Sequence, residues 1–186
     1  RVLFVGAPGV QKGLHYLLQA FARAALLNAR LVIVGHAEPE TEILLKRFPV
    51  ADIDFVGPVS HDEVARQMSR ASVLVLPSIQ EGLAVVQAEA LACECPVISS
   101  THAGGADLFE DGEEGFIVPV GDIDALADRM TRLHDDPALL EAMAEKAGRR
   151  ARQMGGWNNY GDTVCQLFLR LARTKGHNVR LSHLVS

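Results

Sequence analysis

The 186-residue sequence has only three cysteines, Cys93, Cys95 and Cys165, without the even count and spacing of a disulfide framework. We therefore expect reduced thiols and a cytoplasmic protein. The pair Cys93 and Cys95 has no nearby His or further Cys to complete a metal site, and Pro96 follows at once. Small apolar residues leading into a strand are the favoured interpretation, and no metal is expected.

Long apolar runs and a basic excess are also missing. No run approaches the ~20 apolar residues that span a bilayer, and no secretory leader opens the chain. The formal net charge is −5, which argues against a nucleic-acid partner. The chain starts without Met, directly on an apolar run, so we expect it to be part of a longer polypeptide.

Six short, β-branched apolar runs are continuous rather than alternating, which is typical of strands covered on both faces of a parallel sheet. They are residues 2–6, 30–35, 53–57, 72–78, 96–100 and 115–119. Helical periodicity fills the segments between them, at residues 14–27, 40–48, 60–71 and 83–93. Alternating β and α elements predict a Rossmann-like, three-layer α/β/α fold with a mostly parallel sheet of about six strands.

Two further patterns define the helices. Ser60, followed by Glu63 three residues on, predicts an N-cap of the capping-box type. After residue 120 three helices are expected in succession, at residues 122–136, 137–154 and 157–175. We expect one domain over residues 1–174 and a tail over residues 175–186.

Open parallel sheets bind ligands at the carboxyl ends of their strands. The loop after the first strand holds Gly6, Gly9, Lys12 and Gly13. Open backbone amides and a lysine fit a phosphate group, although the spacing matches neither the dinucleotide fingerprint nor the P-loop. A tight turn with a solvated lysine is the alternative.

Glu81 and Glu89 lie eight residues apart in an otherwise apolar, helix-forming stretch. Eight helical residues place two Cα atoms roughly 12 Å apart along the axis. Paired carboxylates of glycoside hydrolases stand ~5–9.5 Å apart, so this pair is better suited to two parts of an extended ligand.

The start of that stretch predicts an anion site, formed by the amides of residues 82–85. Two turns in, Glu89 is suited to accept hydrogen bonds from the vicinal hydroxyls of a ribose. The alternatives are a helix-start charge for Glu81 and a buried structural hydrogen bond for Glu89.

Three other polar residues follow strands or begin helices. His36 follows the second strand and is a candidate ligand contact, whereas packing or capping is favoured for His15 on the first helix. Asp107 follows two glycines and either binds a ligand or caps a helix.

Several motifs in order resemble the C-terminal domain of a GT-B glycosyltransferase, in the retaining group called family 4 or glycosyl transferases group 1. The motifs are "FVGAPGVQKGLHYLLQAF", "LVIVG", "IDFVGPVSHDEVARQMSRASVLVLPS", "EGLAVVQAEALACECPVISS" and "AGGADLFEDGEEGFIVP". The resemblance covers about residues 1–172. It implies transfer of a sugar from a nucleoside-diphosphate sugar to an acceptor hydroxyl, with retention of configuration, without a metal and without another cofactor.

The resemblance also implies roles for individual residues. Glu89 would hold the ribose hydroxyls, Glu81 would face the transferred sugar, and Lys12 would neutralise the diphosphate. Catalytic roles are thus expected for Glu81 and Lys12. Further donor contacts are expected from Gly6, Gly35, His36, Leu83, Ala84 and Val85, with Gly57 and Asp107 as further ligand contacts.

Four positions depart from the family pattern. Ala7 stands where an arginine is usual, and Leu83 with Ala84 replaces a Phe-Gly pair. Asp107 replaces a glutamate, and Glu94 replaces a glycine, so that Glu94 is strained if the backbone there needs a positive φ.

Two hypotheses of different class follow. The chain is either the donor-binding half of a glycosyltransferase, completed by an N-terminal domain, or a nucleotide-sugar-binding module without turnover. An unrelated doubly wound carbohydrate or phosphate enzyme is a more distant alternative. The expected acceptor is a glycan, a lipid-linked sugar or a small molecule, and contact with the inner face of a membrane stays open.

Overall fold

The computed structural model describes residues 1–155, 161–162, 164–168 and 170 of the chain. Residues 1–150 and 151–186 form two compact units, and the first contains the whole sheet. The helix expected at residues 157–175 lies largely outside the described residues, and the expected tail lies wholly outside them. The domain boundary at residue 174 therefore stays a prediction.

The six predicted strands are confirmed, each within two residues of its expected ends, and they form one sheet in which all pairs are parallel. They are β1 (Val2–Val5), β2 (Leu31–Val34), β3 (Ile53–Gly57), β4 (Val73–Leu76), β5 (Val97–Ser100) and β6 (Gly115–Val118). The strand order is β3-β2-β1-β4-β5-β6, the doubly wound order of Rossmann folds. The α/β/α prediction is therefore correct.

The helices also match the predicted pattern, with shifts at their ends. They are α1 (Leu14–Ala24), α2 (Thr41–Arg47), α3 (His61–Ser69), α4 (Val85–Ala92), α5 (Ile123–Asp135) and α6 (Pro137–Met154). α1 ends three residues early, where Ala25 adopts a left-handed conformation. The Ser60 cap is confirmed, because its Oγ accepts a hydrogen bond from the Glu63 amide at 3.3 Å. The Glu63 carboxylate accepts hydrogen bonds from Arg66 and Gln67, so among the described residues only the Ser60 half of the capping box is formed.

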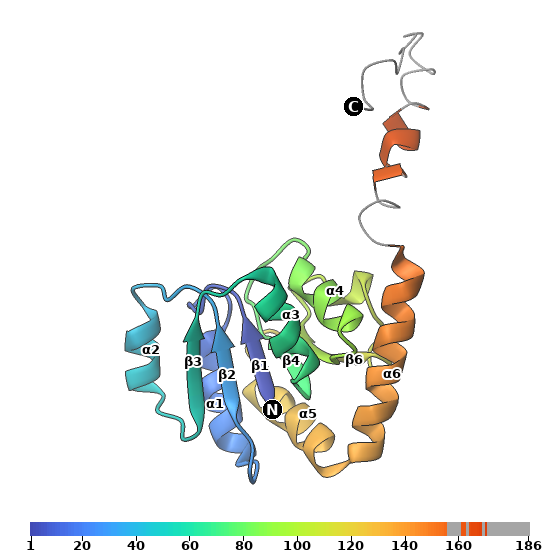
Figure 1. Cartoon of the computed structure of the whole chain (residues 1–186). Helices are drawn as coiled ribbons and strands as arrows, with labels where there is room; N and C mark the ends of the chain where they lie inside the picture. Colours follow the sequence, from blue (N-terminus) through green and yellow to red (C-terminus); the bar gives the residue numbers. More distant parts are fainter. Residues whose placement is uncertain (156–160, 163, 169, 171–186) are drawn as a thin grey trace. The chain divides into compact units, whose positions relative to one another are not determined.

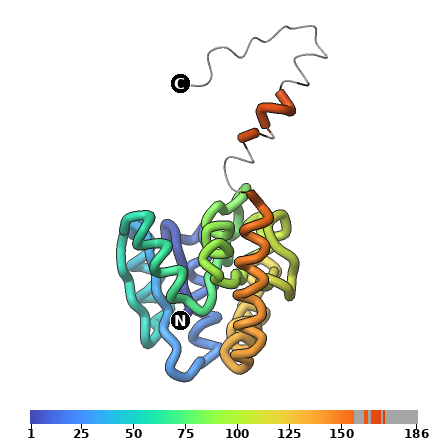
Figure 2. Tube along the Cα trace, turned by 45° about the vertical axis from the view of Figure 1, so that its right-hand side comes forward, coloured from blue at the N-terminus to red at the C-terminus, as the bar shows by residue number. Residues whose placement is uncertain are grey.

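Helices cover both faces of the sheet (Figure 1). α1 and α5 pack together over one face, in a core that includes Leu17, Phe21, Met130 and Leu133. α3 and α4 lie on the opposite face. Up to residue 150, α6 runs past the β6 side of the domain, as Figures 1 and 2 both show. All residues of β2, β4 and β5 are buried, which explains their continuous apolar or small-residue sequences.

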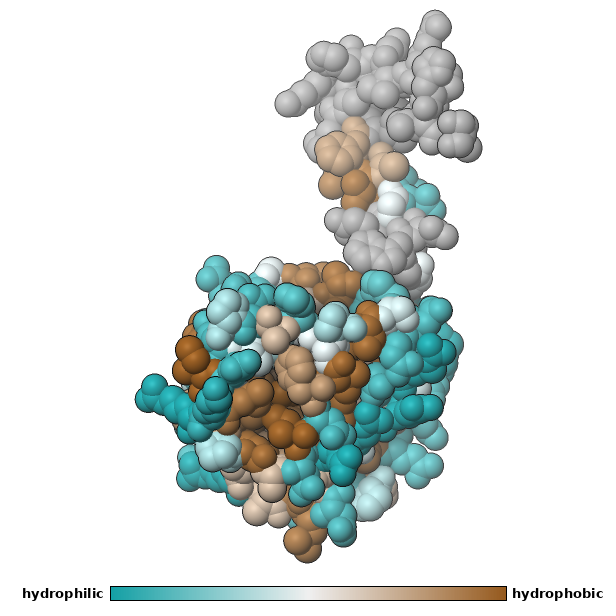
Figure 3. All heavy atoms as spheres, turned by 60° about the vertical axis from the view of Figure 1, so that its left-hand side comes forward, coloured by the Kyte–Doolittle hydropathy of each residue, from teal (hydrophilic) through white to brown (hydrophobic). Residues whose placement is uncertain are grey.

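The β3 edge of the sheet is less well covered. Phe55 and Val56 in this edge strand are 40% and 41% exposed, and Ile43 of α2 is 64% exposed. Figure 3 shows apolar side chains gathered on the face that it brings forward, where the β3 side of the domain lies. Edge strands are where a sheet leaves its backbone and side chains open to solvent.

Within the residues that the structure describes, none of the helices combines the length and the apolar character needed to cross a bilayer.

Candidate donor-binding site

The strand order reverses between β1 and β4, so the loops that follow these two strands border the crevice where doubly wound sheets bind ligands. The two loops lie in close contact. The Ile79 amide donates to the Gln11 carbonyl at 2.9 Å, and a Cβ added at Gly13 would lie 2.0 Å from the Pro77 carbonyl oxygen. Gly13 has φ +72° and precedes α1, so it is the residue that allows this approach.

Lys12 and Glu81 meet across this junction. Lys12 Nζ lies 2.5 Å from Glu81 Oε1, and Ser78 Oγ donates to the same oxygen at 2.8 Å. The Glu81 side chain is 11% exposed and that of Lys12 is 29% exposed. A carboxylate this buried needs partners, and it has a cation and a hydroxyl. The structure thus brings together the two residues for which catalytic roles were expected.

Ser78 was missed as a functional candidate, although "PS" before Glu81 belongs to the motif that carries the resemblance. It is fully buried, and its carbonyl accepts a hydrogen bond from Ser100 Oγ at 2.5 Å. The Ser78 hydroxyl therefore contacts Glu81 from a residue that follows β4 and is hydrogen-bonded to Ser100 at the end of β5.

The two glutamates do not share a helix. α4 begins at Val85, so Glu81 lies in the preceding loop and only residues 85–89 of the interval are helical. The 12 Å estimate, which assumed a continuous helix, therefore does not apply. Glu81 is not a helix-start charge either, because it precedes the helix by four residues and is mostly buried.

Glu89 differs from its expected burial. Its side chain is 37% exposed, and His61 Nδ1 of α3 lies 4.0 Å from its Oε1. The interpretation as a buried structural hydrogen bond is therefore wrong. α4 buries Gln87, Ala90 and Leu91, and Glu89 lies on a more open side of the helix.

The first turn of α4 is only partly open. The Ala84 amide was expected to be free, but it donates to the Ala103 carbonyl at 3.4 Å. Leu83 and Val85 carry side chains that are 52% and 38% exposed, whereas Ala84 is buried.

The loop after β5 closes this side of the site. The Glu81 amide donates to the His102 carbonyl at 2.9 Å, and His102 Nδ1 lies 3.0 Å from the Ile79 carbonyl oxygen. A Cβ added at Gly104 would lie 2.6 Å from the Gly82 carbonyl oxygen. The loops after β4 and β5 thus form one connected wall. His102 contributes to it and was missed, because nothing in its sequence surroundings marks it.

The remaining predicted contacts lie at the same edge of the sheet. Gly35 follows β2, and a Cβ there would lie 1.9 Å from the carbonyl oxygen of Gly6, which follows β1. His36 is exposed beside Gly35, and Gly57 ends β3 with nothing within 4 Å of an added Cβ. The structure brings these residues to the edge of the site without showing a contact to Glu81 or Glu89.

Asp107 is exposed at the end of η1, a 3-10 helix at Gly105–Asp107. Gly104 occupies the N-cap position of η1, and no side chain caps it. The alternative in which Asp107 caps a helix is therefore not supported, and the ligand contact stays a prediction.

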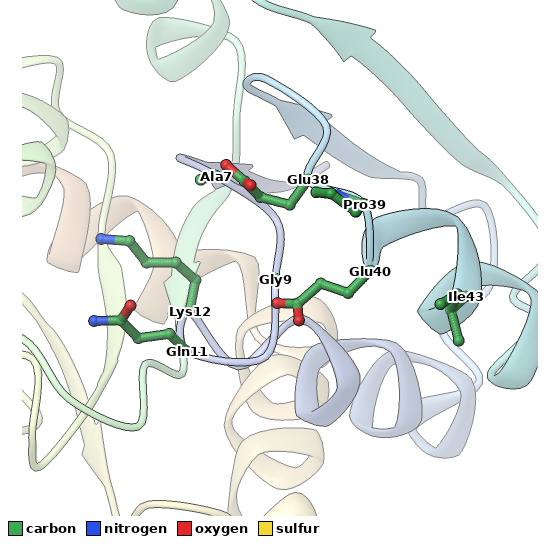
Figure 4. Close-up of a pocket in the computed structure, with 8 residues that line it drawn as sticks. All are labelled: Ala7, Gly9, Gln11, Lys12, Glu38, Pro39, Glu40 and Ile43. Carbon is green, nitrogen blue, oxygen red and sulfur yellow. The ribbon is translucent and has the colours of Figure 1, made fainter.

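A cleft of about 580 Å³ opens beside Lys12, on the β2 side of the first loop (Figure 4). Its lining residues are Ala7, Gly9, Gln11, Lys12, Glu38, Pro39, Glu40 and Ile43. In Figure 4 the Lys12 and Gln11 side chains project from the loop in the same direction. The cleft shares Lys12 with the junction described above but includes neither Glu81 nor Glu89.

Part of the cleft wall is structural. Glu40 Oε1 accepts a hydrogen bond from the Val10 amide at 2.5 Å, and Thr41 Oγ1 donates to the Pro8 carbonyl at 2.8 Å. These contacts fix the first loop against α2. His15, on the other side of that loop, packs its ring against Tyr16 with centroids 3.9 Å apart. Burial lowers the pKa of His15, and the Glu40 charge opposes this shift in part.

Cys95 is buried and Cys93 is half-buried. Burial raises the pKa of the Cys95 thiol to about 12, which keeps it protonated, and Cys93 and Cys95 are not disulfide-bonded. Among the described residues, no three His, Cys, Asp or Glu side chains converge in a way that would hold a metal ion. Independence from a metal stays a prediction.

Comparison with known proteins gives a consistent result. The family described as "Glycosyl transferases group 1" matches residues 1–153. The chain is 34% identical over 151 residues to the alpha-D-kanosaminyltransferase of Streptomyces kanamyceticus, covering 78% of this chain and 39% of that protein.

Two solved structures have the same fold. A sucrose-phosphate synthase from Thermosynechococcus elongatus is 30% identical with a TM-score of 0.83, covering 93% of this chain and 45% of that chain. Anabaena HepE, solved in complex with UDP-glucose, is 22% identical with a TM-score of 0.73, covering 82% of this chain and 44% of that chain. The chain thus spans less than half the length of each of these proteins.

Proposed function

Because the chain belongs to the glycosyl transferases group 1 family, we propose that it is the donor-binding domain of a nucleotide-sugar-dependent glycosyltransferase. The whole enzyme would transfer a sugar from a nucleoside-diphosphate sugar to an acceptor hydroxyl, with retention of configuration. The observation that carries the proposal is the Lys12–Glu81 pair at the point where the strand order reverses.

Lys12 would bind the donor diphosphate. Its ammonium is 29% exposed, lies at the crevice, and borders the 580 Å³ cleft. Negative charge grows on the leaving diphosphate as the glycosidic bond breaks, so a fixed cation there stabilises the transition state more than the ground state. In this mechanism the lysine supplies the charge that a divalent metal supplies in other transferases.

Glu81 would have two roles. It holds Lys12 in position through the 2.5 Å contact, and its remaining oxygen is available to the hydroxyls of the transferred sugar. Ser78 and Lys12 both contact Oε1, and among the described residues Oε2 has no hydrogen-bond partner. One carboxylate oxygen would thus bind the sugar while the other is neutralised.

Glu89 would hold the ribose. Its partly exposed carboxylate has His61 Nδ1 4.0 Å from Oε1, so it can accept hydrogen bonds from a pair of vicinal hydroxyls. The loops at Gly35 with His36 and at Gly57 would border the base. The bound UDP-glucose of HepE makes UDP sugars the first donors to test.

The partners follow from the same proposal. An acceptor glycan, lipid-linked sugar or small molecule would be bound by a second domain, for which the longer relatives have room. The net charge of −5 does not favour nucleic acid.

A nucleotide-sugar-binding module without turnover is the second candidate. Ala7 adds no charge to the cleft that it lines together with Lys12, and the other charged side chains that line this cleft, Glu38 and Glu40, are acidic. A single lysine, already paired with Glu81, would then supply all side-chain cationic stabilisation of the diphosphate. Binding without efficient transfer is the expected consequence.

Two measurements test the proposal. Calorimetry of the chain with UDP, ADP, GDP, CDP and dTDP, and with UDP-glucose, should show binding of at least one nucleoside diphosphate. Absence of binding to all of them would overturn the proposed site. Sugar transfer by the whole protein, lost in its Glu81→Ala variant, would support the transferase, whereas binding without transfer in the wild type would support the module.

A further inference from the structure

Gln87 is a fully buried polar residue in the first turn of α4, and the proposed mechanism does not use it. Its Nε2 donates to the Ala103 carbonyl at 2.6 Å. Its Oε1 is buried and has no hydrogen-bond partner in the part of the chain that the structure describes. A buried amide whose oxygen has no hydrogen-bond partner is unfavourable for stability. The hydrogen bond made by its nitrogen is therefore the feature that needs an explanation.

Two donors reach the same carbonyl oxygen. The Ala84 amide donates to Ala103 at 3.4 Å, beyond the usual range of about 2.7–3.2 Å, whereas Gln87 Nε2 lies at 2.6 Å. The strong hydrogen bond of the Ala103 carbonyl is therefore made with the Gln87 side chain. The Ala84 amide is held only weakly, at the N-cap position of α4 where backbone amides attract anions.

The surroundings of Gln87 keep this arrangement fixed. A Cβ added at Gly105 would lie 3.0 Å from Gln87 Oε1, Ser99 Oγ and a ring carbon of Phe109, so the amide sits in a tightly packed space. Only the nitrogen of the amide can donate to a carbonyl, so the contact with Ala103 also fixes which way the amide is turned.

We infer that Gln87 is a positioning residue, which makes the short hydrogen bond to the Ala103 carbonyl and so leaves the Ala84 amide, held there only by a long contact, able to turn to the donor diphosphate. This inference rests on the proposed function. In this role the buried Gln87 side chain controls whether the Ala84 amide, at the N-cap of α4, can donate to a ligand. It also explains why a polar side chain occupies a position where an apolar one would cost less.

The test compares Gln87→Met with Ser99→Ala. Met has nearly the length of Gln but cannot donate, so the Ala103 carbonyl should recruit the Ala84 amide. The matched control loses another buried polar group, since Ser99 is also fully buried, but leaves the Ala103 contact intact.

Two readouts separate positioning from general stability. In NMR spectra of the free chain, the Ala84 amide proton of Gln87→Met should move downfield and exchange more slowly, and in Ser99→Ala it should not. In calorimetry, affinity for the nucleoside diphosphate that binds the wild type should fall about tenfold or more in Gln87→Met. Affinity for the matching nucleoside should be unchanged.

The outcomes are distinct. In the wild type, the Ala84 amide resonance should shift when the diphosphate is added and not when the nucleoside is added, which tests the inference even if Gln87→Met fails to fold. An unmoved amide, or equal diphosphate affinity of the wild type and Gln87→Met, would overturn the inference while the proposed function stood. If none of the five diphosphates binds the wild type, the proposed function fails and the inference fails with it.

Discussion

Lys12 Nζ lies 2.5 Å from Glu81 Oε1, although the two residues are 69 positions apart in the sequence. The contact closes the gap between the loops after β1 and β4, the two strands at which the sheet reverses its order. A ligand that enters the crevice thus meets a cation and an anion that are already oriented by each other. Preorganised charges of this kind need little rearrangement when the ligand binds.

We expect Lys12→Met to lower the free energy of unfolding by about 1–3 kcal/mol, because it leaves the mostly buried Glu81 carboxylate with Ser78 alone. Urea unfolding followed by circular dichroism measures this. Lys46→Met is the matched control, since Lys46 and Glu42 form an exposed pair at 3.5 Å, and its effect should stay below about 0.5 kcal/mol.

A double-mutant cycle with Glu81→Gln extends this prediction. If the two residues are coupled, the double variant should be less destabilised than the sum of the single variants, by about 0.5 kcal/mol or more. Additive effects would show that the contact contributes little to the fold.

We expect Glu89→Gln to weaken nucleoside diphosphate binding about tenfold, and more than Glu81→Gln does. Glu89 would contact the ribose, which every nucleoside diphosphate carries, whereas Glu81 would contact the transferred sugar. Calorimetry with a nucleoside diphosphate and with the intact sugar nucleotide makes the comparison, with the exposed Glu42→Gln as control. Equal losses for both ligands in Glu81→Gln would contradict the assignment.

We expect Gly13→Ala and Gly57→Ala to differ sharply, although both glycines have nearly the same φ, +72° and +77°. A methyl at Gly13 would collide with the Pro77 carbonyl at 2.0 Å, whereas at Gly57 nothing lies within 4 Å. The free energy of unfolding of the Gly57 variant should fall by about 1–2 kcal/mol, the cost of a Cβ in a left-handed backbone conformation. The Gly13 variant should lose more and should also bind nucleoside diphosphate less tightly, because it separates Lys12 from Glu81. Thermal unfolding and calorimetry measure the two effects.

The sequence was sufficient to predict the sheet and its helices. The strands are buried on both faces, so their apolar runs are unbroken, and the one strand with polar and exposed positions, β3, lies at the edge. Lys12, Glu81 and Glu89 were named because charged residues in apolar or glycine-rich surroundings call for a ligand. Their roles stay predictions, whereas the contact of Lys12 with Glu81 and the position of Glu89 within α4 are shown by the structure.

The contacts between loops could not be predicted. The Lys12–Glu81 distance depends on how closely two backbones approach at Gly13, a long-range property with no local pattern. Gln87 was missed because its local pattern is misleading. It lies within a helical apolar run, where a single glutamine is expected to face solvent. In the structure α4 buries Gln87 together with Ala90 and Leu91.

We expect Glu94→Gly to stabilise the chain relative to Glu94→Ala by about 1 kcal/mol. Glu94 has φ +56°, as anticipated from the glycine usual at this position, and a residue with a Cβ is disfavoured there. Both variants remove the side-chain contacts of Glu94, so the difference between them reports the backbone alone. Urea unfolding of the two variants measures it, and equal stabilities would show that the turn relaxes around the Cβ.

Finally, we expect the chain to lose stability as the pH falls below about 6.5, in part through His15. Burial lowers the pKa of His15 in the folded chain, so the unfolded chain, with the ordinary value of about 6.5, binds a proton first. When the unfolded state binds more protons, stability rises with pH. The contribution of His15 is therefore complete above its unfolded pKa and is lost as the pH falls through its folded one.

His15→Gln removes this titration and keeps a polar side chain on α1. Urea unfolding at pH 5.5 and pH 7.5 should show a smaller difference in stability for the variant than for the wild type. If His15→Gln has the pH dependence of the wild type, burial at this position does not discriminate against the charged imidazole.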